Sequence, residues 1–189
     1  MKRNIREMSE MVPDARKALI LFDSSDVSMT AVEDEFRNQT TLKLGNLTVE
    51  IKLLGDFSLW KQAVESANQD GTDMIFIGLY RTLHDELGQY TLPETVINWT
   101  GRHARMPLFG FWDFSIGKGR AIGGLVLSGK EQGFAAADLA LAILASDKPA
   151  QTFAPRTAER GEYLFSQSAL RHSQLQLPAN IRQKSNWLP

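Results

Sequence analysis

Short apolar runs alternate with helix-like segments along most of the chain, and this alternation constrains the fold most strongly. The runs at residues 18–22, 47–54, 74–78, 108–111 and 121–127 have the length and composition of strands, and the first is continuously apolar. Strands that are apolar on both sides occur in parallel sheets with helices on each face. The sequence therefore predicts an α/β fold with a Rossmann-like or flavodoxin-like, mostly parallel sheet and flanking helices.

Helix-start signals lie between these runs. A helix capped by Asp56 or Ser58 is expected to run to about residue 68, and Pro93 opens another. Thr30 and Glu33 have the spacing of a capping box, which predicts a helix start at that point. The last forty residues are expected to hold one short strand at 163–165 and one short helix.

Length and charge exclude several classes of protein. The 189 residues suffice for one domain with its own core, and 21 basic against 22 acidic residues argue against a dedicated nucleic-acid or anionic-membrane binder. The absence of cysteine excludes disulfides and thiolate catalysis. No apolar run approaches the roughly 20 residues of a membrane-spanning helix. The basic N-terminus precedes no apolar stretch, so no secretory signal is predicted there.

Polar and aromatic residues follow three of the predicted strands, at the sheet edge where ligands of open α/β folds gather. The set offers a guanidinium for a carboxylate, carboxylates for an amine and aromatic faces for an apolar group, which suits a small polar or zwitterionic ligand. The same residue types also serve as ordinary turn and cap residues, and that alternative stays open for each of them. The candidate ligand-binding residues are Asp23, Ser24, Ser25, Tyr80, Arg81, Trp112 and Asp113.

Other motifs indicate neither a cofactor nor a metal. The glycine-rich run 117–124 lacks the spacing of a dinucleotide-binding turn and precedes a strand, so we expect a loop with close backbone packing at Gly123 and Gly124. The histidines His84, His103 and His172 have no partner at metal-ligand spacing. No catalytic residue, cofactor or metal site is predicted.

A cluster of cations occupies residues 102–120, where Arg102, Arg105, Lys118 and Arg120 face only Asp113 in the sequence. Such a basic rim can attract an anion. A solvated face is the commoner outcome of this pattern.

The segment 131–145 is apolar nearly all round, after a second capping box at Ser128 and Glu131. A helix of this kind must be covered on several sides. We expect it either to be buried within this domain or to need a partner that the chain lacks.

Four stretches of the chain carry a family resemblance: residues 5–25 (IREMSEMVPDARKALILFDSS), 107–124 (PLFGFWDFSIGKGRAIGG), 128–149 (SGKEQGFAAADLALAILASDKP) and 168–188. They resemble the ABC-transporter substrate-binding proteins of the periplasmic type I class, including the branch found as sensor domains. The first two stretches look like the family's crossings between lobes, the third like its alanine-rich helix and the fourth like its closing segment. Residues 84–88 resemble the sensor-type branch more than the transport-type branch.

The resemblance implies one lobe of a type I periplasmic-binding fold, with the family's first lobe absent. In that arrangement residues 1–17 form a lead-in helix and hinge-side linker, and 18–189 the ligand-binding lobe. Residues 106–149 then supply a crossing and a helix that packs on the missing lobe. Carried over by position, Asp23, Ser24, Ser25, Tyr80, Trp112 and Asp113 line the cleft between lobes.

The implied function is non-enzymatic binding of a small solute, such as an amino-acid-like molecule, in a periplasmic or other extracytoplasmic location. The implied partners are a membrane permease or a sensor kinase, together with the missing N-terminal lobe or a second copy of the chain. No nucleic acid is implied. The alternatives are a flavodoxin-like enzyme domain that binds a nucleotide or phosphate, and a regulatory module similar to a receiver domain.

Overall fold

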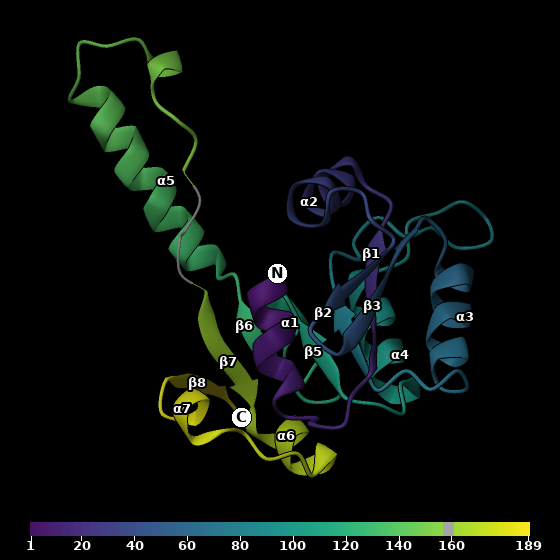
Figure 1. The fold of residues 1–189 in the computed structure, drawn as a ribbon. Coiled ribbons are helices and arrows are strands. Elements are labelled where there is room, and N and C mark those ends of the chain that lie inside the picture. Colours follow the sequence, from purple (N-terminus) through teal and green to yellow (C-terminus); the bar gives the residue numbers. More distant parts are fainter. Residues whose placement is uncertain (157–160) are drawn as a thin grey trace.

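One mixed sheet with helices on both faces organises the computed structural model, which describes residues 1–156 and 161–189 (Figure 1). The strand order is β2-β3-β1-β4-β5-β6-β7-β8, and all neighbours are parallel except β2 with β3 and β6 with β7. The mostly parallel α/β fold is confirmed. The strands are β1 (Lys17–Asp23), β2 (Thr41–Leu44), β3 (Leu47–Leu54), β4 (Met74–Ile77), β5 (Leu108–Gly110), β6 (Gly123–Val126), β7 (Glu162–Ser166) and β8 (Ser185–Leu188).

The two faces of the sheet support separate apolar layers. In β1, Ile20 and Phe22 pack on one face while Leu19 and Leu21 pack on the other, as the period of a strand requires. The helices α1 (Lys2–Ser9) and α2 (Asp26–Phe36) cover the first face, and α3 (Phe57–Ala67) and α4 (Pro93–His103) cover the second. Full burial of each large apolar side chain stabilises the fold by about 1.5 to 3 kcal/mol.

Polar contacts inside this core fix helices to their neighbours. The Asn4 side chain in α1 donates to the Gly110 carbonyl at 2.8 Å and accepts from the Leu125 amide at 3.1 Å, so one helix residue joins β5 and β6. The Trp60 indole donates to the Thr100 hydroxyl at 2.9 Å and joins α3 to α4. Each contact satisfies groups that would otherwise be buried without a partner.

The start of α2 differs from the sequence-based expectation. The helix begins at Asp26 with Ser25 as its N-cap, and the Ser25 hydroxyl accepts from the Ser28 amide at 3.3 Å. Thr30 and Glu33 lie inside the helix, so the capping box placed there is wrong. Ser25 satisfies an N-terminal amide five residues earlier, and the chain turns into the helix directly after β1.

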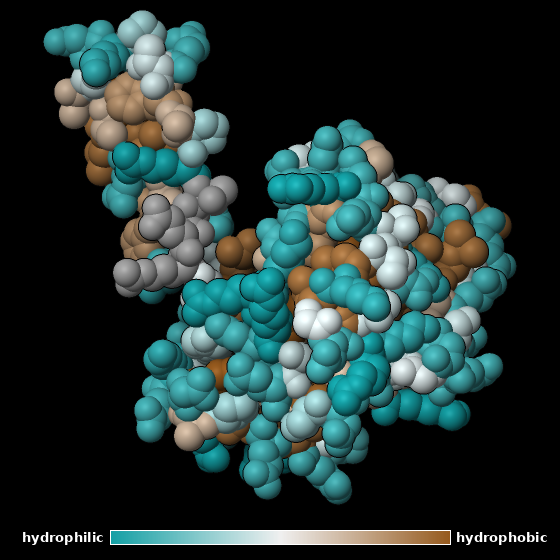
Figure 2. All heavy atoms as spheres, in the orientation of Figure 1, coloured by the Kyte–Doolittle hydropathy of each residue, from teal (hydrophilic) through white to brown (hydrophobic). Residues whose placement is uncertain are grey.

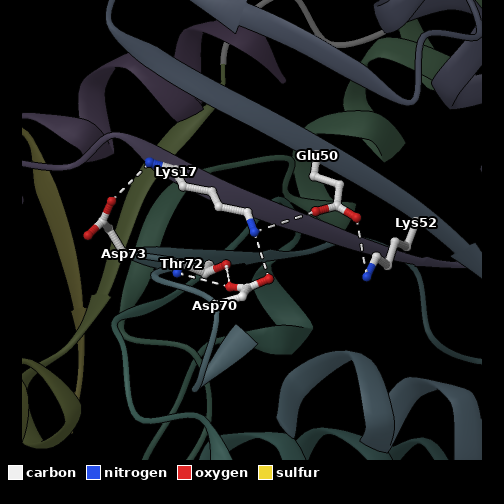
Figure 3. Close-up of polar contacts among 6 residues, drawn as sticks. All are labelled: Lys17, Glu50, Lys52, Asp70, Thr72 and Asp73. Carbon is white, nitrogen blue, oxygen red and sulfur yellow. Dashed lines mark hydrogen bonds and ion pairs between the residues drawn. The ribbon is translucent and has the colours of Figure 1, made fainter. Parts of the chain in front are cut away.

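The amino ends of β1, β3 and β4 are held by a network of charged groups (Figure 3). Asp73 Oδ2 accepts from the backbone amides of Arg16 and Lys17 at 2.7 and 2.9 Å. Lys17 Nζ lies 2.6 Å from Asp70 Oδ2 and 3.9 Å from Glu50 Oε2. Figure 3 shows Lys17 between the two carboxylates, so this network fixes the end of the sheet opposite the predicted ligand loops.

The glycine pair before the apolar helix has the close packing that the sequence predicts. A Cβ at Gly123 would overlap the Phe165 ring, and a Cβ at Gly124 would overlap the Gly110 carbonyl oxygen. These two positions let β6 approach β5 and β7 closely.

The helix α5 (Gly129–Leu144) projects away from the sheet, and none of its residues is buried (Figure 1). Figure 2 shows apolar surface along this projecting arm. Of the outcomes expected from its sequence, burial within the domain is wrong, because the described chain buries no residue of this helix. The chain then returns through β7 to the short helices α6 (Gln167–Ser173) and α7 (Ala179–Arg182). No helix in the described residues is long and apolar enough to span a membrane.

Candidate functional site

Three loops meet where β1, β4 and β5 end, and we call this face of the molecule the carboxyl edge. The chain order of the sheet reverses at β1, because β3 lies on one side of it and β4 on the other. Such a switch point opens a crevice between diverging loops. The loops that begin at Asp23, Gly78 and Phe111 lie there, and all seven candidate residues belong to them.

Asp23 connects the first two loops. Its carboxylate accepts from the hydroxyls of Ser25 and Ser28 at 2.6 and 2.5 Å, and from the amides of Arg81 and Thr82 at 2.8 and 3.1 Å. Only 1% of Asp23 is exposed. Both carboxylate oxygens are thus engaged within the protein, and a ligand amine would have to displace these contacts to reach them.

The protonation of Asp23 follows from the same contacts. Burial alone would raise the pKa of this carboxyl, but hydrogen bonds from Ser25, Ser28 and Thr82 outweigh burial and hold the pKa below 3.8. Asp23 is therefore charged at neutral pH. Ser24, next to it, is exposed, while Ser25 is half-buried as the α2 cap.

The second loop presents one buried and one exposed side chain. Tyr80 is 2% exposed and packs on Trp60 and Phe114 at centroid distances of 6.5 and 5.8 Å. Burial raises the pKa of Tyr80 to about 12, so its hydroxyl stays neutral. Arg81 is exposed, and its guanidinium carbon lies 4.7 Å from the centre of the Phe114 ring. Arg81 therefore keeps a positive group at the surface of the carboxyl edge.

The third loop completes an aromatic surface. Trp112 and Phe114 are stacked at 6.3 Å with an interplanar angle of 17°, and Trp112 also meets Phe22 edge-on at 6.3 Å. The cation–π contact of Arg81 with Phe114 joins this surface to the second loop. Trp112 and Arg81 are thus brought together by Phe114, which is not among the seven residues predicted from the sequence.

Asp113 holds its own loop and the start of α5. Its Oδ1 accepts from the Phe114 amide at 2.8 Å, and its Oδ2 accepts from the Gly129 amide at 3.2 Å. Ser128 is the N-cap residue of α5, as the sequence predicts, but its side chain makes no cap hydrogen bond. The Asp113 carboxylate satisfies that helix end instead.

A hollow of about 340 Å³ opens between the third loop and the first turn of α5. It combines an aromatic wall with the Asp113 carboxylate and polar groups from the helix start. Ser128 and Gln132 were not expected to belong to the site, because only the fold places the α5 start beside Trp112. The lining residues are Trp112, Asp113, Phe114, Leu127, Ser128, Gly129 and Gln132.

Apolar side chains with high exposure gather in two places on the described residues. One group surrounds the carboxyl edge, at the starts of α2 and α3, the end of β3 and the loop before α4, and the other lies on α5. The first group is Val27, Met29, Leu53, Leu59, Leu87, Tyr90 and Leu92, and the second is Phe134, Leu141 and Leu144.

Metal ligands do not cluster in the part of the chain that the structure describes. No group of three or more His, Asp or Glu side chains there could hold a metal ion. His84 lies at the carboxyl edge, but its ring packs on Tyr90 at a centroid distance of 4.5 Å with an interplanar angle of 31°.

Comparisons with known proteins identify similar folds. No family model matches the chain, and no curated protein matches it significantly. A solved structure described as the ABC domain in complex with L-Trp, from Streptococcus pneumonia, aligns with a TM-score of 0.69 at 15% identity over 100% of this chain. A ligand-free, open substrate-binding protein with adhesive properties from Clostridium difficile aligns with a TM-score of 0.62 at 12% identity over 100% of the chain.

A conserved domain protein from Vibrio cholerae aligns over 98% of the chain, with a TM-score of 0.61 at 14% identity. The chain spans only 60%, 59% and 59% of the Streptococcus, Vibrio and Clostridium proteins, respectively. At this level of identity the likeness shows the fold alone, and that fold is the periplasmic-binding-protein-like domain that the sequence resemblance implies.

Proposed function

We propose that this chain is the ligand-binding lobe of a two-lobe solute-binding or sensory receptor protein. Its ligand is a small zwitterion of the amino-acid type, held between the carboxyl edge and a further lobe. The observation that carries the proposal is the distribution of exposed apolar side chains, which lie around the carboxyl edge and on α5. These are the surfaces that a second lobe would cover.

The exposed apolar side chains support this arrangement through their position and size. Leu87 is 83% exposed, Tyr90 70% and Leu92 69%, and all three lie on the loop between β4 and α4, which also carries Arg81. Exposed apolar groups gathered around a polar centre are typical of a surface that another element covers. A lobe that closes over the site would bury them and exclude water from the ligand.

The arm formed by α5 supports the same division of the chain. We propose that residues 1–17 lead into the lobe, that 18–189 form it, and that 106–149 cross toward the other lobe and supply a helix to it. Phe134, Leu141 and Leu144 are 56%, 65% and 82% exposed on this helix. A helix so apolar requires more cover than the described residues provide, since none of its residues is buried. A second copy of the chain is the competing source of that cover.

The chemistry of the carboxyl edge favours binding over catalysis. Arg81 offers a guanidinium for a ligand carboxylate, and Trp112 with Phe114 offers a stacked aromatic wall. The Asp23 carboxylate accepts five hydrogen bonds and does not act as a free base. The alternative of a nucleotide-binding, flavodoxin-like enzyme is less favoured, because Asp23 at the end of β1 and Asp26 at the start of α2 repel phosphate.

Titration of the isotopically labelled chain with a panel of amino acids, followed by amide chemical shifts, tests the ligand class. L-Tryptophan belongs in the panel, because it is the ligand of the Streptococcus structure. We expect weak, saturable binding with shifts confined to loops 79–82 and 112–116. Arg81→Gln should weaken it about fivefold or more, near 1 kcal/mol, whereas Lys43→Gln on β2 should have no effect. No shift in these loops with any amino acid would contradict the proposed ligand class.

We propose that lobe closure on the ligand is the signal that a membrane permease or a sensor kinase detects. This role places the protein outside the cytoplasm. Fractionation of the source cells tests that location, and recovery of the protein only from the cytoplasm would contradict it.

A further inference from the structure

A second hollow lies at the opposite end of the strands from the carboxyl edge. Its volume is about 700 Å³, within the range of about 300 to 1,000 Å³ usual for small-molecule sites. Leu108 begins β5 and Ile122 directly precedes β6, so the hollow opens at the amino ends of these strands. Its walls are the end of α4 with the turn that follows, the turn before β6, and α6. We call it the amino-edge hollow.

Positive charge dominates the lining of the amino-edge hollow. Arg102, Arg105, Lys118 and His172 line it, and no Asp or Glu of the described residues does. None of the ion pairs within residues 1–156 and 161–189 involves Arg102, Arg105 or Lys118. These cations come from separate elements, in a protein whose net charge is only −1. The fold therefore concentrates uncompensated charge here.

The end of α3 holds the backbone at Arg105, and a contact within α4 holds Arg102. The Asn68 side chain accepts from the Arg105 amide at 2.9 Å and donates to the His103 carbonyl at 3.0 Å. Arg102 Nε donates to the Asn98 carbonyl at 3.0 Å, which uses one of its five N–H groups. The backbone that carries both guanidinium groups is thus fixed, which lowers the entropy cost of ligand binding.

The turn that carries Lys118 is packed directly against α4. A side chain at Gly101 would overlap the Gly119 carbonyl, so helix and turn are in contact. Arg120 Nε donates to Asn98 Oδ1 at 3.2 Å and ties the same turn to the helix. The backbone that carries Lys118 therefore lies against the part of α4 that carries Arg102.

The carboxyl end of α4 places a partial negative charge at the hollow. A helix carboxyl end carries only about half a negative elementary charge, and three full cations outweigh it. The floor includes Met106, Leu108 and Ile122, which can contact an apolar part of a ligand. Guanidinium groups bind phosphate and carboxylate in two parallel hydrogen bonds.

We propose that the amino-edge hollow binds a small polyanion that carries two or more phosphate or carboxylate groups. The site is separate from the carboxyl edge and does not depend on the ligand proposed there. A polyanion bound here stabilises the folded lobe through linkage.

Calorimetric titration of the whole chain with inorganic pyrophosphate and with citrate, at about 0.15 M salt to screen diffuse attraction, tests the proposal. We expect one saturable site for at least one of these probes. The double variant Arg102→Gln/Arg105→Gln should weaken binding about tenfold or more, near 1.4 kcal/mol. The control Lys43→Gln/Lys184→Gln removes the same charge from exposed positions elsewhere and should change affinity less than about twofold.

Three results would overturn the proposal: no saturable binding of either probe, equal weakening in the control variant, or saturation only by an acidic peptide such as hexaglutamate. The last result would identify the hollow as a protein-docking surface. Amino-acid titration of the double variant separates the two sites, because binding at the carboxyl edge should persist in it.

Discussion

At the scale of single residues, Asp23 illustrates why the sequence predicts the location of the site better than its chemistry. A polar turn after a buried strand marks the carboxyl edge whether its residues bind a ligand or support loops. Asp23 supports loops, since it accepts hydrogen bonds from Arg81 and Thr82, which lie nearly sixty residues away. No local pattern contains these partners. The sequence could therefore place Asp23 at the edge but could not distinguish the two roles.

The substitution Asp23→Asn is expected to lower the free energy of unfolding by about 2 kcal/mol. The asparagine side chain has one oxygen that can accept hydrogen bonds, but its NH2 group replaces the other. That NH2 group would face backbone N–H groups or hydroxyls that already donate, so some buried donors lose their acceptor. Urea denaturation at pH 7 measures the loss. Asp26→Asn in the exposed first turn of α2 is the control and should cost no more than about 0.5 kcal/mol. Equal effects of the two substitutions would show that the buried contacts of Asp23 add no stability.

The same carboxyl predicts how stability depends on pH. The pKa of Asp23 is lower in the folded protein than its ordinary value of 3.8. Its contribution is therefore complete above that pH and is lost as pH falls through the folded pKa. Urea denaturation from pH 7 to 3 should show the difference between wild type and Asp23→Asn shrinking below about pH 4. A difference that stays constant across this range would contradict the lowered pKa.

At the scale of elements, strands and helices with strong apolar patterns were predictable, and elements defined by distant contacts were not. The runs at 18–22 and 47–54 correspond to β1 and β3. The strands β2 and β8 were not predicted, because each has four residues and little pattern of its own. Trp187 of β8 packs on Phe165 of β7 at 6.2 Å, and that contact exists only after the chain has folded.

Helices α1 and α5 should differ sharply in what they contribute to stability. Met8 in α1 is 0% exposed, so Met8→Ala leaves a cavity and should lower the free energy of unfolding by about 2 to 5 kcal/mol. Leu144 in α5 is 82% exposed, and Leu144→Ala should change the free energy of unfolding by no more than about 0.5 kcal/mol. Urea denaturation of both variants checks the contrast. A large loss in Leu144→Ala would mean that α5 is covered in solution.

At the scale of the whole molecule, the opposite edges of one sheet carry different surfaces. The carboxyl edge joins Arg81, Phe114 and Trp112 beside exposed apolar groups, and the amino edge gathers cations. The sequence could predict the first edge, because the carboxyl ends of parallel strands must meet there. The sequence also shows Arg102, Arg105 and Lys118 as a basic stretch, but His172 is too distant in the chain to be assigned to the same site. That histidine reaches the same hollow only because β7 runs antiparallel to β6.

Hydrogen exchange can determine whether α5 is covered when the chain is alone. A 16-residue helix that buries none of its residues is only marginally stable, so its amides should exchange orders of magnitude faster than those of β1 and β4 in the sheet centre. Mass spectrometry of peptides from 129–144 and from both strands measures the contrast. Strong protection of α5 would contradict an uncovered arm and favour a second copy of the chain as its cover. In that case Leu141→Glu should abolish the protection and return the protein to monomers in sedimentation, since a buried charge opposes such a contact.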